Sequence, residues 1–319
     1  MISRDPDELM DAAATGSRTA LARLLTYVES GGPNQRAVAA RAYAVPAPYV
    51  VGLTGPPGAG KSTLTDALIS ALLARGDLGP VRFDELGVLC VDPSSPFSGG
   101  AILGDRIRMQ SHATNDAVFI RSMATRGHLG GLSLAVPDAL RVLGAAGFAL
   151  ALVETVGVGQ MEVDVASAAD TTVVVTNPGW GDAMQANKAG LLEVADIFVI
   201  NKADRAGVAE TRRDLEQMLD LGGPYEWRPP ILETIATSAT GIDSLLEAMG
   251  AHADFLADGR LEGHRRAQAA RELDAVIAAS LRARVRELAH GEAYERALEE
   301  IVAGRTDPYR AAETLLSEP

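Results

Sequence analysis

The chain has 319 residues, a formal net charge of −13 at pH 7 and a single cysteine. The acidic balance disfavours a general nucleic-acid or anionic-membrane binder, because both of these partners are polyanions. One cysteine excludes an internal disulfide framework and any cysteine-cluster metal site, and it fits a reducing compartment. The start of the chain is acidic and polar, so we expect no targeting segment and a cytoplasmic location.

Residues 1–46 are predicted to form an N-terminal helical extension. Apolar residues recur at helical spacing within Pro6–Tyr43, and this stretch holds no strand-like run. The turn signal Gly31-Gly32-Pro33 divides the stretch into two predicted helices.

Residues 47–258 are predicted to form an α/β domain. Short apolar runs recur along it, at Tyr49–Leu53, Leu86–Val91, Val118–Ile120, Phe148–Val153, Thr171–Val175, Ile197–Ile200 and Ile231–Ile235. Helical patterns separate most of them, at Lys61–Arg75, Pro137–Ala146, Val163–Ala169, Val208–Leu219 and Ile242–Phe255. Most of the apolar runs are continuous, which is typical of strands covered on both faces. We therefore predict a mainly parallel β-sheet flanked by helices.

Residues 259–319 carry helical patterns only. One apolar stripe comprises Leu273, Val276, Ile277, Leu281, Val285 and Leu288, and a second comprises Tyr294, Leu298, Ile301 and Val302. Two interpretations are open: the helices pack on the central domain, or they form an arm that pairs with a second subunit.

Residues 55–62 read GPPGAGKS and fit the phosphate-loop pattern G-x-x-x-x-G-K-[ST]. The loop follows one predicted strand and opens a predicted helix, so its backbone N–H groups form an anion site. Lys61 is predicted to reach the β- and γ-phosphates, and the Ser62 hydroxyl to bind Mg²⁺. The candidate nucleotide-binding residues here are Gly55, Pro56, Pro57, Gly58, Ala59, Gly60, Lys61, Ser62 and Thr63. The motif predicts a nucleoside triphosphate site.

An N-K-x-D motif ends a buried predicted strand and indicates guanine as the base. The Asp204 carboxylate can accept hydrogen bonds from both guanine donors, whereas adenine would leave it unpaired. Asn201 is predicted to brace the loop and approach N7, and the Lys202 stem to cover one face of the base. A second loop supplies Ser238, Ala239 and Thr240, and the Ala239 N–H is a candidate donor to O6. GTP or GDP is therefore the expected ligand.

Three acidic residues are candidate magnesium ligands, because a hard cation prefers oxygen donors. Asp92 and Glu154 end predicted parallel strands, at the edge of the sheet where ligands bind. Asp105 follows a loop that begins after Asp92.

Three further residues are candidates for the hydrolytic step. Gly157 lies in E-T-V-G, which corresponds to D-x-x-G of small GTPases, and can offer its N–H to the γ-phosphate. Gln160 is a candidate for orienting water, and Lys188 for reaching the phosphates from a further loop. No single arginine stands out as a finger, so we expect slow intrinsic hydrolysis.

These motifs together resemble the MeaB/ArgK family of P-loop GTPases. The stretches that carry the resemblance run in order over most of the chain: Gly52–Thr63, Val91–Met109, Thr125–Ser133, Glu154–Gln160 and Asn201–Asp204. The resemblance implies a P-loop NTPase fold of the SIMIBI class, which also holds the signal-recognition and nickel-insertion GTPases.

The resemblance also implies a function. It is that of a chaperone that binds and hydrolyses GTP, gates adenosylcobalamin loading and protects methylmalonyl-CoA mutase, a cobalamin-dependent acyl-CoA mutase. It implies a homodimer that uses the C-terminal helical arm. Asp92, Asp105 and Glu154 match the family's magnesium-site acids, and Asn177–Lys188 resembles its third switch, with Lys188 as a catalytic lysine.

Two alternative functions stay open. A nickel-insertion GTPase needs cysteine or clustered histidine ligands, but Cys90 lies in a predicted strand, where we expect it to be buried, and the five histidines are dispersed. A small-molecule or protein kinase, as the name ArgK suggests, usually needs ATP, and N-K-x-D disfavours adenine.

Overall fold

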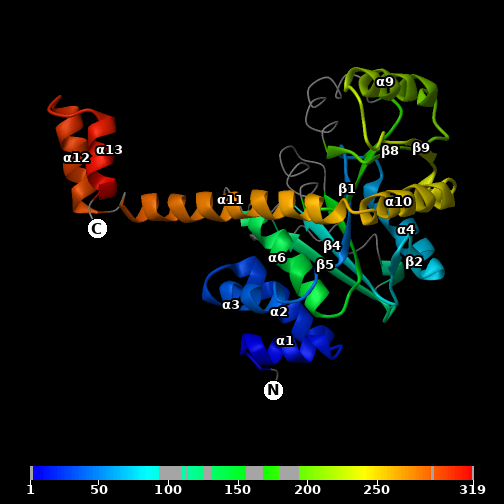
Figure 1. The fold of residues 1–319 in the computed structure, drawn as a ribbon, viewed down its shortest axis with the longest axis horizontal. Coiled ribbons are helices and arrows are strands. Elements are labelled where there is room, and N and C mark those ends of the chain that lie inside the picture. The colour runs from blue at the N-terminus through cyan, green and yellow to red at the C-terminus, as the bar shows by residue number, and fades with distance from the viewer. Residues whose placement is uncertain are drawn as a thin grey trace. The chain divides into compact units, whose positions relative to one another are not determined.

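The computed structural model describes residues 3–92, 110–112, 114–124, 131–155, 168–179, 194–288 and 291–317. The chain divides into two compact units, Met1–Ala269 and Ala270–Pro319 (Figure 1). Four predicted site residues lie outside the described residues: Asp105, Gly157, Gln160 and Lys188. The predicted helix Val163–Ala169 also lies mostly outside them. Of the helices that are described, none has both the length and the apolar character needed to cross a membrane.

A seven-stranded, fully parallel sheet forms the centre of the first unit and confirms the predicted fold class. Its strands are β1 (Tyr49–Thr54), β4 (Leu86–Asp92), β5 (Val118–Ala124), β6 (Leu150–Thr155), β7 (Thr171–Thr176), β8 (Ile197–Asn201) and β9 (Ile231–Thr234). They are ordered β5-β4-β6-β1-β7-β8-β9, so every predicted strand is present. A separate antiparallel pair, β2 (Asp77–Leu78) and β3 (Val81–Arg82), was not predicted.

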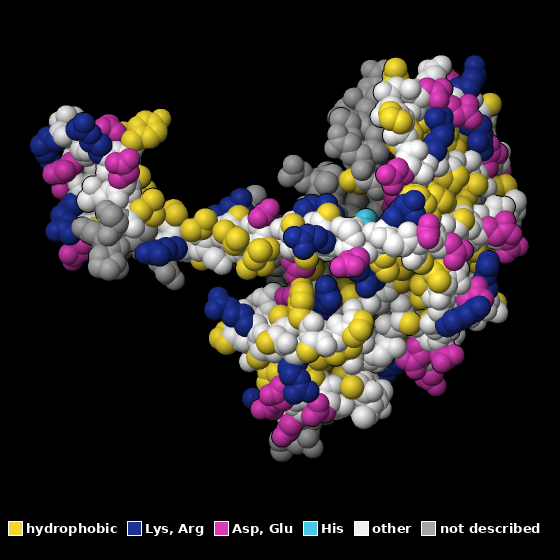
Figure 2. Space-filling model, viewed as in Figure 1, with side chains coloured by type: hydrophobic (Ala, Val, Ile, Leu, Met, Phe, Trp, Pro, Cys, Tyr) yellow, Lys and Arg dark blue, Asp and Glu magenta, His cyan; other side chains and the backbone are white. Residues whose placement is uncertain are grey.

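The second unit is helical. It contains the larger part of α11 (Leu261–Leu288), together with α12 (Glu292–Val302) and α13 (Pro308–Ser317). Helices α12 and α13 contact each other, and both lie within residues 259–319, which were predicted to be helical. The first predicted stripe lies on α11, where Leu273 and Leu281 are each 59% exposed (Figure 2).

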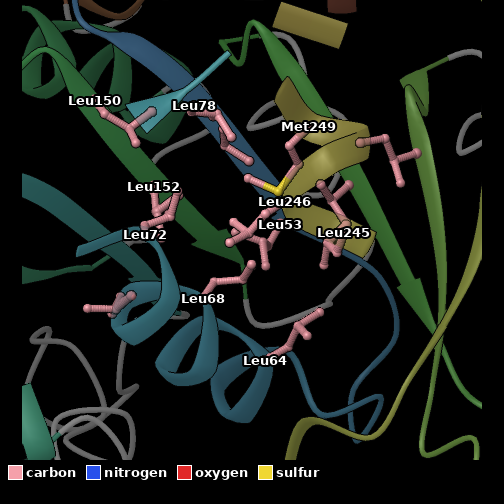
Figure 3. Packing of buried hydrophobic residues seen from close by; sticks show 14 of the residues in the cluster. Leu53, Leu64, Leu68, Leu72, Leu78, Leu150, Leu152, Leu245, Leu246 and Met249 are labelled. Atoms are coloured by element: carbon pink, nitrogen blue, oxygen red, sulfur yellow. The ribbon is translucent and has the colours of Figure 1, made fainter. Parts of the chain in front are cut away.

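Strand residues alternate between two hydrophobic clusters, one on each face of the sheet. Val51 and Leu53 of β1 pack with α4 (Lys61–Arg75) and α10 (Ile242–Ala257) (Figure 3). Val50, the residue directly before Val51, belongs to the opposite cluster, which also includes residues of α1 (Pro6–Ala14), α2 (Arg18–Ser30), α3 (Pro33–Ala42) and α6 (Gly131–Ala145). A third cluster joins α9 (Val208–Leu221) to β7 and β8. Burial on both faces explains why the central strands β1, β6, β7 and β8 are continuously apolar.

The N-terminal helices differ from the prediction in number. Three form instead of two, because the chain also turns at Gly16, whose φ of +95° is in the left-handed region that favours glycine. The Ser17 side chain then caps α2 by accepting a hydrogen bond from the Ala20 N–H.

Helix α6 also differs from the prediction. It begins at Gly131, and Pro137 lies inside it rather than at its start. Val136 and Leu140 are buried in the cluster with the N-terminal helices, and this packing outweighs the hydrogen bond that the proline cannot donate.

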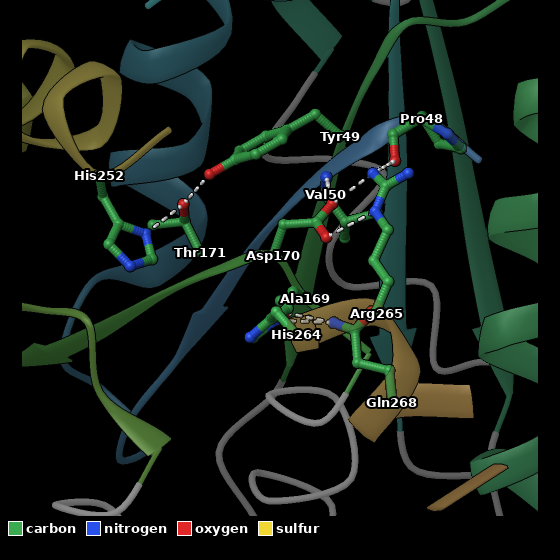
Figure 4. A network of polar contacts seen from close by, with 10 residues as sticks. All are labelled: Pro48, Tyr49, Val50, Ala169, Asp170, Thr171, His252, His264, Arg265 and Gln268. Carbon is green, nitrogen blue, oxygen red and sulfur yellow. Dashed lines mark hydrogen bonds and ion pairs between the residues drawn. The ribbon is translucent and has the colours of Figure 1, made fainter. Parts of the chain in front are cut away.

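A chain of polar groups lies at the end of the sheet where β1 and β7 begin (Figure 4). The Tyr49 hydroxyl and Thr171 Oγ1 are 2.6 Å apart, and Thr171 Oγ1 lies 2.9 Å from His252 Nδ1. His252 Nε2 is 3.3 Å from Asp196 Oδ1. Desolvation raises the pKa of Asp196 to about 7 and lowers the pKa of His252 to about 4.

These two pKa shifts make opposite contributions to stability. Folding raises the pKa of Asp196 from 3.8 to about 7, so the folded state binds more protons in this window and the contribution is lost as the pH rises through it. Folding lowers the pKa of His252 from 6.5 to about 4, so its contribution is lost as the pH falls through that window. The two contributions overlap and offset each other between about pH 4 and 6.5.

We predict that single substitutions separate the two contributions. Between about pH 5 and 6.5, the free energy of unfolding of His252→Asn should fall with rising pH relative to the unsubstituted chain, by on the order of 1 kcal/mol per pH unit. The free energy of unfolding of Asp196→Asn should rise by a similar amount over the same range. Urea unfolding at several pH values measures both slopes. Equal slopes for the two variants would contradict the assignment.

Candidate nucleotide-binding site

The phosphate loop connects β1 to α4, and two of its glycines are fixed by close contacts. An added Cβ at Gly55 would lie 2.0 Å from the Val175 carbonyl oxygen of β7. At Gly60 it would lie 2.4 Å from Asn201 Nδ2, and φ is +93°. The loop therefore passes across the end of β7 and against β8 in a conformation that requires glycine at both positions.

Lys61 holds its ammonium group inside this loop. Lys61 is the first residue of α4 and is 5% exposed. Its Nζ donates hydrogen bonds to the carbonyl oxygens of Gly55 at 2.6 Å and Pro56 at 3.0 Å. The loop thus surrounds a buried positive charge, next to the N-terminus of a helix, and both features favour an anion.

The side chains of Ser62 and Glu154 bring two oxygen atoms that can bind a metal ion together beside the loop. Ser62 Oγ donates to Glu154 Oε1 at 2.6 Å, and Glu154 is 3% exposed on β6. Asp92 ends β4, the neighbour of β6, so the sheet brings both strand ends to the same edge. The Asp92 side chain lies outside the described set. A hydroxyl and a carboxylate are ligands of the kind that Mg²⁺ prefers, so the donor set fits that ion.

Asn201 connects the phosphate loop to the segment after β9. Its Nδ2 donates to the Ala59 carbonyl oxygen at 2.9 Å. Its Oδ1 accepts from Thr234 Oγ1 at 3.1 Å and from the Ala236 N–H at 3.2 Å. The residue is 2% exposed, so each half of the amide is satisfied within the protein.

Lys202 and Asp204 lie in a pocket beside Asn201. Lys202 has a φ of +59°, and its Nζ donates to the Gly58 carbonyl oxygen at 2.6 Å, which stretches the aliphatic stem toward the phosphate loop. The pocket is lined by Gly60, Thr63, Asn201, Lys202, Asp204, Ile235, Ala236 and Thr237. Residues from both predicted motifs therefore share one pocket.

The predicted site residues did not include Ile235, Ala236 or Thr237, although Thr237 directly precedes the predicted Ser238, Ala239 and Thr240. Of Ser238, Ala239 and Thr240, none belongs to the lining formed by described residues. The Ala239 N–H donates to the Ala236 carbonyl oxygen at 3.3 Å, and Ser238 Oγ lies 2.9 Å from Thr240 Oγ1. The position of residues 235–237 in the sequence could have indicated them. Residues that directly follow a parallel strand such as β9 lie closest to the edge of the sheet where ligands bind.

We predict that Gly60→Ala lowers the free energy of unfolding by about 3 kcal/mol, because the added methyl group clashes with Asn201 and the backbone is strained. Gly58→Ala is a matched control: its φ is +78°, but nothing lies within 4 Å of an added Cβ. The control should cost only about 1 kcal/mol, from backbone strain. Urea unfolding measures both values, and an equal loss in the two variants would contradict the packing argument.

The chain is similar over most of its length to a family of GTPases. The model of the family described as methylmalonyl Co-A mutase-associated GTPase MeaB matches residues 21–290. A putative GTPase of Pyrococcus abyssi is 46% identical and covers 98% of this chain and 96% of its own. The GTPase ArgK of Escherichia coli is 40% identical and covers 79% of this chain and 78% of its own.

A solved structure agrees with these relatives. The crystal structure of an LAO/AO transport system kinase superposes with a TM-score of 0.71 at 28% identity, and covers 99% of this chain and 98% of that one. The relatives above are named GTPases, and the fold and the phosphate loop are those of a P-loop GTPase. The chain belongs to the MeaB family, and it is a P-loop GTPase that binds and hydrolyses GTP.

Proposed function

We propose that this GTPase is a chaperone of an adenosylcobalamin-dependent methylmalonyl-CoA mutase, which it loads with cofactor and protects from inactivation in a GTP-dependent manner. The family description over residues 21–290 carries the assignment of the client. A methylmalonic aciduria type A homolog of Mus musculus, 34% identical over 82% of this chain, lends the same support. Cytoplasmic location is part of the proposal.

The phosphate loop is proposed to bind the triphosphate through its backbone N–H groups and the N-terminus of α4. The Lys61 ammonium donates to the carbonyl oxygens of Gly55 and Pro56 in the phosphate loop, and its flexible stem is proposed to let it turn to a β- or γ-phosphate bound there. It then stabilises negative charge that develops on the transferred group.

Ser62 and Glu154 are proposed to hold Mg²⁺, with Asp92 and Asp105 as further acidic ligands. Bound there, the ion supplies charge neutralisation of the phosphates. The proposed roles of the remaining residues follow the motifs: Gly157 donates its N–H to the γ-phosphate, Gln160 orients water and Lys188 contacts the phosphates. Slow intrinsic hydrolysis belongs to the same proposal.

The pocket beside Asn201 is proposed to bind guanine. Asp204 accepts from the two guanine donors, and the extended Lys202 stem covers one face of the base. We propose that residues 235–237 complete the pocket, because they line it and are tied to Asn201 through the Ala236 N–H. Ser238, Ala239 and Thr240 are proposed to contact the edge of the base, with the Ala239 N–H as the candidate donor to O6.

Asp204→Asn should lower the affinity for GTP at least about tenfold, because the amide presents a donor to a donor of guanine. The same variant should gain affinity for XTP, in which a carbonyl oxygen replaces the exocyclic amino group. Equilibrium binding of both nucleotides measures the exchange of preference. Asp243→Asn, an exposed aspartate on α10, is the matched control and should leave both affinities unchanged. An equal loss of GTP and XTP binding would contradict base reading by Asp204.

A homodimer is proposed to form through the exposed stripe of α11. Leu273, Val276, Ile277, Leu281 and Val285 are between 43% and 59% exposed, and they recur at helical spacing. Large apolar side chains gathered on one helix are typical of an interface, and a second copy offers the same stripe. Size measurement in solution at several protein concentrations tests this part of the proposal.

The two alternative functions have less support. Cys90 is 2% exposed inside β4 and packs in the hydrophobic cluster on the α4 and α10 face of the sheet, as predicted for a core residue. The described residues hold no group of three or more histidine, cysteine or acidic side chains suited to a metal ion. A kinase function finds no observation among the described residues that favours it over hydrolysis.

The client is tested by GTP hydrolysis with and without an adenosylcobalamin-dependent methylmalonyl-CoA mutase. We expect the mutase to bind and to stimulate turnover at least about tenfold, as activating partners do for GTPases that lack an arginine finger. Lys61→Ala is the control: it should lose turnover and keep its fold. Neither binding nor stimulation by the mutase would overturn the client assignment, whereas normal turnover in Lys61→Ala would overturn the phosphate-loop assignment.

A further inference from the structure

The first turns of α11 are held on the first unit by polar contacts. Residues 261–269 belong to this unit, and none of them is buried. His264 Nε2 lies 3.1 Å from the Ala169 carbonyl oxygen, and Gln268 Nε2 donates to the same oxygen at 2.7 Å (Figure 4). Arg265 lies between these residues on the helix and makes the only ion pair that the described structure gives to this segment.

The Arg265 ion pair is bidentate and nearly closed to solvent on the acidic side. Arg265 Nε lies 3.1 Å from Asp170 Oδ1, and Nη2 lies 3.0 Å from Asp170 Oδ2. Nη2 also donates to the Pro48 carbonyl oxygen at 3.0 Å. The Asp170 side chain is 3% exposed and that of Arg265 is 30% exposed. Water therefore has access from the arginine side only.

Asp170 also connects the starts of two central strands. Its Oδ2 accepts from the Val50 N–H at 2.9 Å, and its own N–H donates to the Val50 carbonyl oxygen at 2.8 Å. Asp170 directly precedes β7, and Val50 lies in β1, the strand that leads into the phosphate loop. One carboxylate thus joins β1, β7 and α11.

We infer that the Asp170–Arg265 pair is a latch, which holds the first turns of α11 against the sheet and lets them separate while the sheet stays folded. Two features support this inference. Leu261 packs against the hydrophobic cluster, but residues 262–269 contribute no buried residue to it, so separation of the helix beyond Leu261 exposes little apolar surface. The Asp170 carboxylate keeps its hydrogen bond from Val50 when the arginine leaves, and incoming water can satisfy the rest.

Amide hydrogen exchange of the full chain tests the latch. Arg265→Gln removes the charge and the bidentate geometry, and Asp170→Asn keeps an acceptor for the Val50 N–H while removing the charge. Helical turns that lose their packing contacts are only marginally stable, so in both variants we expect the detached turns to fray and the amides of residues 264–269 to exchange at least about tenfold faster, with unchanged exchange in β8 and α10. Arg266→Gln, at the exposed next position, is the matched control and should exchange like the unsubstituted chain.

Two results would overturn the inference. Unchanged protection of residues 264–269 in both variants would mean that other contacts hold the helix. Equal acceleration in β8 and α10 would mean that the pair stabilises the whole unit and is no latch. Retained nucleotide binding in each variant verifies that the first unit is folded during the measurement.

Discussion

The amide of Asn201 is the contact on which the nucleotide site depends. The strand order places β7 between β1 and β8, so the phosphate loop and the N-K-x-D segment start from strands that are not neighbours. Asn201 spans this gap, because one end of its amide donates to Ala59 and the other accepts from Thr234 and Ala236. An aspartate at this position could not donate, and an alanine would leave three buried backbone or hydroxyl groups without a partner.

This bridge imposes constraints on the backbone around it. The loop has to cross the end of β7 at close range, which leaves no room for a side chain at Gly55. Gly60 must approach the Asn201 amide closely, and Lys202 adopts a left-handed conformation that aims its stem toward the loop. The shape of the pocket thus follows from parallel strands of fixed spacing and one amide that joins their ends.

The opposite end of the sheet carries a second set of polar contacts. There, Asp170 joins β1 to β7 and holds Arg265 of α11. The polar chain from Tyr49 to Asp196 lies beside it, and Figure 4 shows the part from Tyr49 through Thr171 to His252. At one end of these two strands, the phosphate loop leaves β1 and crosses β7. At the other end, Asp170 attaches α11 to both strands.

Hydrophobic periodicity and short motifs were sufficient to predict much of the molecule. Short apolar runs predicted all seven parallel strands, and most of these runs are continuous, because burial of the central strands on both faces leaves no polar alternation. The phosphate loop and N-K-x-D could be located because their chemistry needs a few residue types at fixed spacing. The break at Gly16 and the start of α6 before Pro137 were missed, since local signals there compete with packing that the sequence does not display.

The sequence by itself determined the order of elements, the phosphate loop and the preference for guanine. Only the tertiary structure decided which residues share the pocket. Residues 235–237 line it, because the Asn201 amide holds the chain there immediately after β9. The bidentate pairing of Asp170 with Arg265 was likewise invisible in the sequence: 95 residues separate the two, and no local pattern reports a contact that the folding of the sheet creates.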